Sequence, residues 1–121
     1  MKLRRSPYAS ADLRNAFRYS RAEHGDAGLK RYRALIETAL REIVADPFRP
    51  TSRDRTNVVQ GLRSYHIKHS RARSPEKSVR APCHILYYRV TQDADNADAV
   101  TLLRVLQDTW EPAARDFRDD D

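Results

Sequence analysis

Basic residues and histidines gather in the stretch GLRSYHIKHSR, residues 61–71. The side chains that could handle a phosphate lie in this stretch and in two later apolar stretches: Arg63, His66, Lys68, His69, Arg71, Arg89 and Arg104. Cleaving RNA takes a base for the 2′-hydroxyl proton, cations that stabilise the phosphorane and an acid for the leaving oxygen, and His, Lys and Arg can share that work. If the strands that carry these residues pair side by side, several of them reach one anionic group. The alternative is an exposed basic strand face whose other face packs on the core.

Imidazole and thiolate together suit zinc, and four such residues occur: His66, His69, Cys83 and His84. On a strand, residues 66 and 69 point to opposite faces, and so do residues 83 and 84, so at most two of the four converge. We therefore expect no metal site and no cofactor. Cys83 is the only cysteine, which also excludes a disulfide within the chain.

Strand alternation divides the stretch 61–71 between two faces. One face carries Arg63, Tyr65, Ile67 and His69, and the other carries Leu62, Ser64, His66 and Lys68. At most half of the stretch can therefore meet a partner on one face. The same rule applies to Tyr87 and Tyr88, of which only one can join a stacking surface for bases while the other belongs to the core.

Size and composition fit one domain that meets an anionic partner. The chain has 121 residues and a net charge of +6, with 33% charged and 40% hydrophobic residues. The charge indicates nucleic acid or an acidic protein segment as partner, without choosing between them. No apolar run approaches the roughly 18 residues of a membrane span. The basic amino terminus lacks the apolar stretch of a secretory signal, so we expect a cytoplasmic protein.

The order of elements predicts an α+β fold, β-α-α-β-β-β. Residues 1–6 form a first strand, and Ser6-Pro7 begins a helix that Gly25 ends. Asp26 caps a second, more strongly amphipathic helix that ends at DPFRP, and the short turn makes the two helices an antiparallel hairpin. Three strands follow, in LRSYHIKH, CHILYYRV and AVTLLRVL. The hairpin is expected to cover one face of a small antiparallel sheet.

Less regular segments complete the predicted domain, residues 1–118. The linker SRARSPEKSVRAP is polar and long for a hairpin loop, so we expect a surface excursion there. A short helix in DTWEPAARDF is expected to close the chain, with Trp110 and Phe117 packing back on the sheet. Residues 119–121 form an acidic end that is expected to be disordered.

Several residue sets occur in a familiar order: Ser6-Pro7 before the helix, Gly61-Leu62-Arg63, Tyr88-Arg89 and Arg104-Val105-Leu106. With the stretches SPYASADLRNAFRYSRAEHG, GLRSYHIKHSR, HILYYRV and LLRVLQD, the chain resembles the RelE/ParE superfamily of toxins from bacterial type II toxin–antitoxin modules, and within it the ParE branch. The resemblance runs over nearly the whole chain. It implies a small basic toxin that a ParD-like antitoxin wraps and neutralises.

The two branches of the superfamily share a fold but not a target, so the fold does not decide the function. ParE-like members inhibit DNA gyrase, and RelE-like members cut messenger RNA on the ribosome. Here Gln107 stands where ParE-like sequences often have histidine, and no tyrosine follows. Neither Gln107 nor Trp110 can act as an acid or base, which weakens the nuclease interpretation.

The resemblance therefore favours a gyrase inhibitor that acts by protein contact rather than as an enzyme, with direct nucleic-acid binding left open. The residues expected to bind partners are Arg63, Tyr65, Lys68, Arg71, Tyr88, Arg89 and Arg104. The alternative is a ribosome-dependent endoribonuclease in which His66 and Lys68 transfer protons and Arg63, Arg89 and Arg104 stabilise phosphate charge. A toxin that has lost its activity, given Gln107, is a third possibility.

Overall fold

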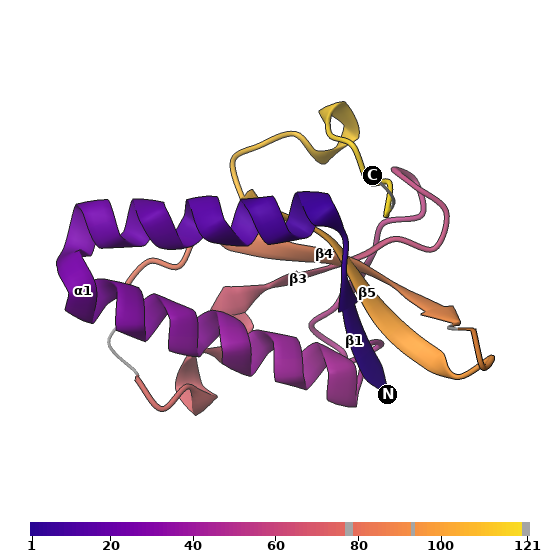
Figure 1. Ribbon diagram of the computed structural model, residues 1–121, viewed down its shortest axis with the longest axis horizontal. Coiled ribbons are helices and arrows are strands. Elements are labelled where there is room, and N and C mark those ends of the chain that lie inside the picture. Colours follow the sequence, from indigo (N-terminus) through magenta and orange to yellow (C-terminus); the bar gives the residue numbers. More distant parts are fainter. Residues whose placement is uncertain (77–78, 93, 120–121) are drawn as a thin grey trace.

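An interrupted helix packs on one face of a twisted sheet in the computed structural model of the chain, which describes residues 1–76, 79–92 and 94–119 (Figure 1). The order of elements is β1, α1, β2, β3, η1, β4, β5 and η2. The α+β class is as predicted. No helix of the described residues is long and apolar enough to cross a membrane.

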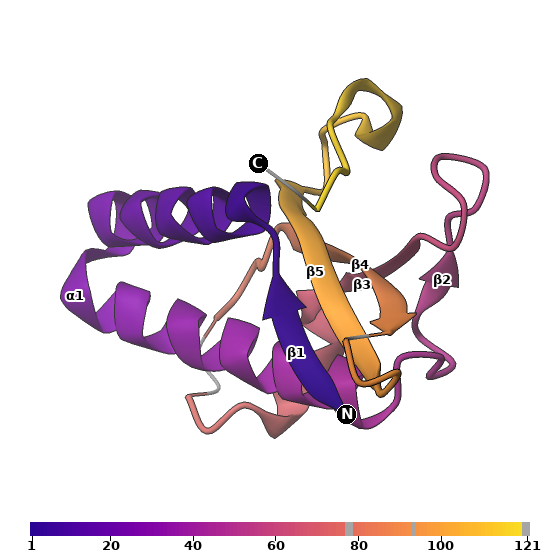
Figure 2. The ribbon, with the colours of Figure 1, turned by 45° about the vertical axis from the view of Figure 1, so that its right-hand side comes forward.

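The helix α1 (Pro7–Ala45) is the predicted hairpin, because its backbone leaves helical geometry at Gly25. Gly25 has φ 72° and ψ −172°, a conformation that is essentially restricted to glycine. The chain reverses there, and the two arms of α1 lie side by side in both views of the ribbon (Figures 1 and 2). Ser6 caps the first arm as predicted, with its hydroxyl accepting from the Ala9 amide at 3.0 Å. Asp26, predicted to cap the second arm, instead pairs with Arg21 at 2.9 Å.

The turn of α1 also depends on a close approach at Gly28. Its carbonyl accepts a hydrogen bond from the Ser20 hydroxyl of the first arm at 3.3 Å. A Cβ atom placed on Gly28 would lie 2.2 Å from the Cβ of His24, well inside van der Waals contact. The arms can therefore meet here only because residue 28 has no side chain.

The sheet has five strands in the order β1-β5-β4-β3-β2: β1 (Lys2–Arg5), β5 (Asp98–Gln107), β4 (His84–Gln92), β3 (Arg63–His66) and β2 (Arg53–Asp54). The prediction of an antiparallel sheet is correct for β2 to β5 and wrong for β1, which runs parallel to β5. The sheet is therefore mixed. The two-residue strand β2 was not predicted, since so short a segment carries no periodicity.

The strand predicted in LRSYHIKH, residues 62–69, is four residues long in the structure, and the chain then forms a 3₁₀ helix, η1 (Ile67–Arg73). His66 causes the change, because its Nδ1 accepts from the Lys68 amide at 3.1 Å and so caps η1. Glu42 of α1 holds η1 through Ser70 and Arg73. The predicted surface excursion is thus shorter than expected, and its residues 77–78 lie outside the described ranges.

Both faces of the sheet are covered. The main core lies between α1 and the sheet and includes Leu35, Ile36, Leu86 and Leu102. A second cluster on the opposite face is Leu62, Tyr87, Leu103, Leu106 and Phe117. Tyr87 and Tyr88 fall in different clusters, as alternation predicted, but both are buried, so neither offers a stacking surface for bases.

The chain's last segment closes the second cluster. A three-residue 3₁₀ helix, η2 (Pro112–Ala114), stands where a short helix was expected. Phe117 packs back as predicted and meets the Tyr87 ring edge-on, with ring centroids 5.4 Å apart. Trp110 does not pack back on the sheet as predicted; it is 39% exposed. Of the acidic end, Asp119 is exposed and residues 120–121 lie outside the described part of the chain.

Candidate functional site

Arg104 lies in β5 and is bound by Asp12 of α1. Its Nε and Nη2 donate to the two carboxylate oxygens at 2.7 and 3.1 Å, and its Nη1 donates to the Asp116 carbonyl at 3.1 Å. The side chains of Arg104 and Asp12 are only 15% and 11% exposed. These hydrogen bonds raise the pKa of Arg104 above its ordinary value. The guanidinium is therefore occupied within the fold.

Arg63 and Tyr88 meet around Ser52 at the other end of the sheet. Arg63 Nε donates to the Ser52 hydroxyl at 2.8 Å, and the guanidinium lies 5.0 Å from the centre of the Phe48 ring. The Tyr88 hydroxyl is 2.7 Å from the same Ser52 oxygen and donates to the Pro47 carbonyl at 2.5 Å. Burial raises the pKa of Tyr88. Both side chains tie the segment before β2 to the sheet.

His66 has both ring nitrogens in use. Nδ1 accepts from the Lys68 amide, so the proton of a neutral ring is on Nε2, which lies 2.9 Å from the Asp108 carboxylate. The ring centroid of His69 is 6.5 Å away. The pKa of His69 is lowered, first by burial and then by the positive charges of Lys68, His66, Arg53 and Arg49. His66, Lys68 and His69 thus lie together at the start of η1, where Lys68 is exposed and positively charged.

The remaining predicted partner residues differ in access. Tyr65 is fully buried, with its hydroxyl 2.8 Å from that of Ser70, and Tyr88 is also fully buried. A partner could reach neither without opening the core, so their role in this structure is packing. Arg71 is exposed and donates to the Arg80 carbonyl at 2.7 Å. Arg89 packs over Gly61 and lies 3.9 Å from the Asp119 carboxylate.

The predicted phosphate cluster is therefore not assembled. His66 and Lys68 are neighbours, whereas Arg63, Arg89 and Arg104 are each bound to a different part of the chain. Alternation places Arg63 on the helix-covered face with Tyr65, while Arg89 is on the face of Leu62 and Tyr87. The sequence could not show this for Arg104, because its partner Asp12 is 92 positions away.

The order of strands, the interrupted helix and the basic η1 can be compared with known families. Residues 3–109 match the family model described as the ParE toxin of the type II toxin–antitoxin system, parDE. The chain belongs to the ParE toxin family. This confirms the resemblance noted in the sequence, and it implies a cognate ParD antitoxin as partner. A comparison with curated proteins gives no match.

Cys83 and His84, considered above as zinc ligands, belong in this ParE toxin to a polar cluster with Tyr32, a partner that the sequence did not indicate. Tyr32 Oη is hydrogen-bonded to His84 Nδ1, and it accepts from the Cys83 amide at 3.3 Å. His84 is 4% exposed, and burial lowers its pKa to about 4. Burial also raises the pKa of Tyr32 and of Cys83. His84 is therefore a neutral, hydrogen-bonded core residue. Among the described residues no three His, Cys, Asp or Glu side chains are grouped as metal ligands.

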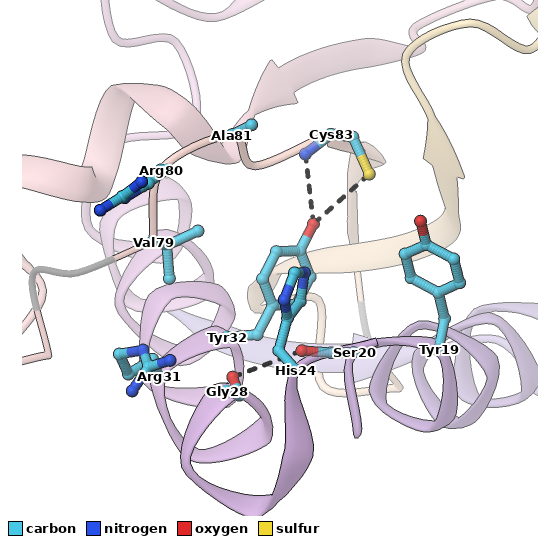
Figure 3. A pocket seen from close by; sticks show the side chains of 10 residues that line it. All are labelled: Tyr19, Ser20, His24, Gly28, Arg31, Tyr32, Val79, Arg80, Ala81 and Cys83. Atoms are coloured by element: carbon cyan, nitrogen blue, oxygen red, sulfur yellow. Dashed lines mark hydrogen bonds between the residues drawn. The ribbon is translucent and has the colours of Figure 1, made fainter. Parts of the chain in front are cut away.

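A pocket of about 810 Å³ opens beside this cluster, between the two arms of α1 and the segment before β4 (Figure 3). We call it the hairpin pocket. Its lining residues are Tyr19, Ser20, His24, Gly28, Arg31, Tyr32, Val79, Arg80, Ala81 and Cys83. None of the residues predicted to bind partners lines it.

Proposed function

We propose that this ParE toxin inhibits DNA gyrase by protein contact in the cytoplasm, and that a ParD-like antitoxin neutralises it. The family match supports the toxin role. One structural observation supports contact rather than catalysis: of the groups assigned to RNA cleavage, all but the exposed Lys68 are already bound within the fold. Asp12 binds Arg104, Ser52 binds Arg63, and both nitrogens of His66 have partners.

The supercoiling assay tests this proposal. Purified toxin should block gyrase-catalysed supercoiling or stabilise gyrase-cleaved DNA, and added antitoxin should restore activity. Gyrase that keeps full activity in the presence of toxin, while cells expressing the toxin still stop growing, would refute the proposed target.

The antitoxin is expected to meet η1, where Lys68, Arg71 and Arg73 are all exposed. Lys68 is exposed, and Arg53, Arg49 and His66 add positive potential around His69. An acidic segment would be attracted and oriented by this group. Lys68→Glu should weaken antitoxin binding, measured by calorimetry, by about tenfold or more, the scale of one charge-assisted hydrogen bond. Arg14→Glu makes the same kind of change on an exposed part of α1 and serves as the control.

A second candidate function, ribosome-dependent RNA cleavage, rests on the His66–Asp108 pair. A carboxylate that orients an imidazole is an arrangement that general bases use, and Lys68 lies beside it. To take a proton, His66 would have to release the Lys68 amide from its Nδ1. A translating extract with a defined message provides the test. Cleavage by the parent that disappears in the His66→Ala, Lys68→Ala double variant would favour the enzyme; an intact message favours the gyrase proposal.

A further inference from the structure

The hairpin pocket carries unbalanced positive charge. Arg31 and Arg80 line it, and neither is paired with a carboxylate among the residues that the structure describes. Arg31 is partly buried, so it lacks full access to water as well as an acidic partner. His24 also lines the pocket, and none of the acidic residues in the described ranges does. A planar guanidinium in this position favours an anion that offers two neighbouring oxygens, such as a phosphate or carboxylate.

The rest of the pocket is suited to a flat, less polar group. Tyr19 is 51% exposed and lines the pocket, together with the small apolar side chains of Val79 and Ala81. In Figure 3 the two arginines lie on one side of the pocket and Tyr19 lies on the other. An exposed tyrosine face stacks readily on aromatic rings.

The wall between these two ends is preformed. Tyr32 is fixed by its hydrogen bonds to Cys83 and His84, and Ser20 is fixed by the Gly28 carbonyl. A ligand would therefore order few additional side chains on binding, which reduces the entropic cost of association. The volume of about 810 Å³ falls within the usual range of small-molecule sites.

We propose that the hairpin pocket binds a small organic anion, with its phosphate or carboxylate group on Arg31 and Arg80 and a flat ring against Tyr19. No residue of η1 lines the site, although Arg71 of η1 donates to the Arg80 carbonyl. The proposal does not depend on the proposed gyrase target. Because it touches both arms of α1 and the segment before β4, an occupied pocket clamps these three parts together.

Nuclear magnetic resonance titration of the full chain tests the site with four probes: adenosine monophosphate, benzoate, inorganic phosphate and adenosine. At least one of the two aromatic anions should shift the amide signals of Gly28, Tyr32 and Cys83 in a saturable way. Which of the two binds more tightly decides between phosphate and carboxylate. Inorganic phosphate, which lacks the ring, and adenosine, which lacks the charge, should bind more weakly.

Variants separate this site from the general positive charge of the protein. The Arg31→Gln, Arg80→Gln double variant should lose about tenfold or more in affinity, since each arginine supplies a charge-assisted hydrogen bond. Arg14→Gln, on the exposed surface of α1, should bind as the parent does. No saturable shift with either aromatic anion at millimolar concentration, equal affinity in the double variant, or adenosine binding as tightly as its monophosphate would each overturn the proposal. Gyrase inhibition is measured separately, so a wrong target leaves this result intact.

Discussion

The Asp12–Arg104 pair should be one of the largest polar contributions to stability, and Asp12→Ala tests it. The carboxylate accepts from two nitrogens of Arg104 and from the Val105 amide, at 2.7, 3.1 and 2.9 Å. The substitution leaves a largely buried guanidinium and a backbone N–H without their acceptor. Breaking one side of a buried pair costs about 3–5 kcal/mol. We take about 3 kcal/mol, because the 15% exposure of Arg104 lets water replace part of the contact.

Urea unfolding followed by circular dichroism measures this loss. Asp98→Ala, at an exposed position of β5, is the control and should change the free energy of unfolding by less than about 0.5 kcal/mol. The double variant Asp12→Asn, Arg104→Met removes both charges and keeps an acceptor for the Val105 amide, so it should recover much of the loss. If Asp12→Ala unfolds like the control, Arg104 is not held by the fold and is again available for a phosphate.

Three further predictions concern the core and η1. The pKa of His84 is about 4 in the folded protein, against 6.5 ordinarily. Between these values the unfolded chain binds a proton at His84 that the folded protein does not, so the free energy of unfolding is highest above about pH 6.5 and falls as the pH drops towards 4. We expect a loss of about 3 kcal/mol over that window, seen by unfolding at several pH values and absent in His84→Gln. Gly28→Ala should lower stability by about 1–3 kcal/mol through overpacking against His24, and adding His24→Gly should restore part of it in thermal unfolding. Glu42→Gln should weaken the contacts to η1 and speed hydrogen exchange of its amides by about tenfold, while amides of β4 keep their rates.

The helix hairpin could be read from the sequence because its signals are local. Ser6 and Pro7 determine where the first arm begins, and Gly25 supplies the backbone conformation of the turn. The periodic residues of the second arm, such as Leu35, Ile36 and Ile43, are all in the main core. Each of these features depends on residues within a few positions of one another.

The features that were missed depend on distant partners or on one side-chain contact. The parallel pairing of β1 with β5 joins residues nearly a hundred positions apart, as in Leu3 opposite Val100. The end of β3 is set by the His66 imidazole capping η1, which hydrophobic periodicity does not register. The basic residues of the candidate site looked equivalent in the sequence, and only their partners in space separate bound Arg104 from exposed Lys68.

The difference between paired and unpaired basic side chains also determines which residues produce the positive electrostatic field of the toxin. When two opposite charges of the toxin pair with each other, as Arg104 does with Asp12 and Arg73 with Glu42, their electric fields cancel at a distance. Such a pair therefore adds little to the attraction of a partner. The group around His69 is different, because the positive charges of Lys68 and its neighbours act together there and add to the effect of burial, which is the larger cause of the lowered pKa of that imidazole. An acidic segment placed on this group would offset those charges and raise the pKa of His69 again. Antitoxin binding at η1 is therefore expected to take up a proton near the ordinary pKa of histidine, whereas binding elsewhere on the toxin is not.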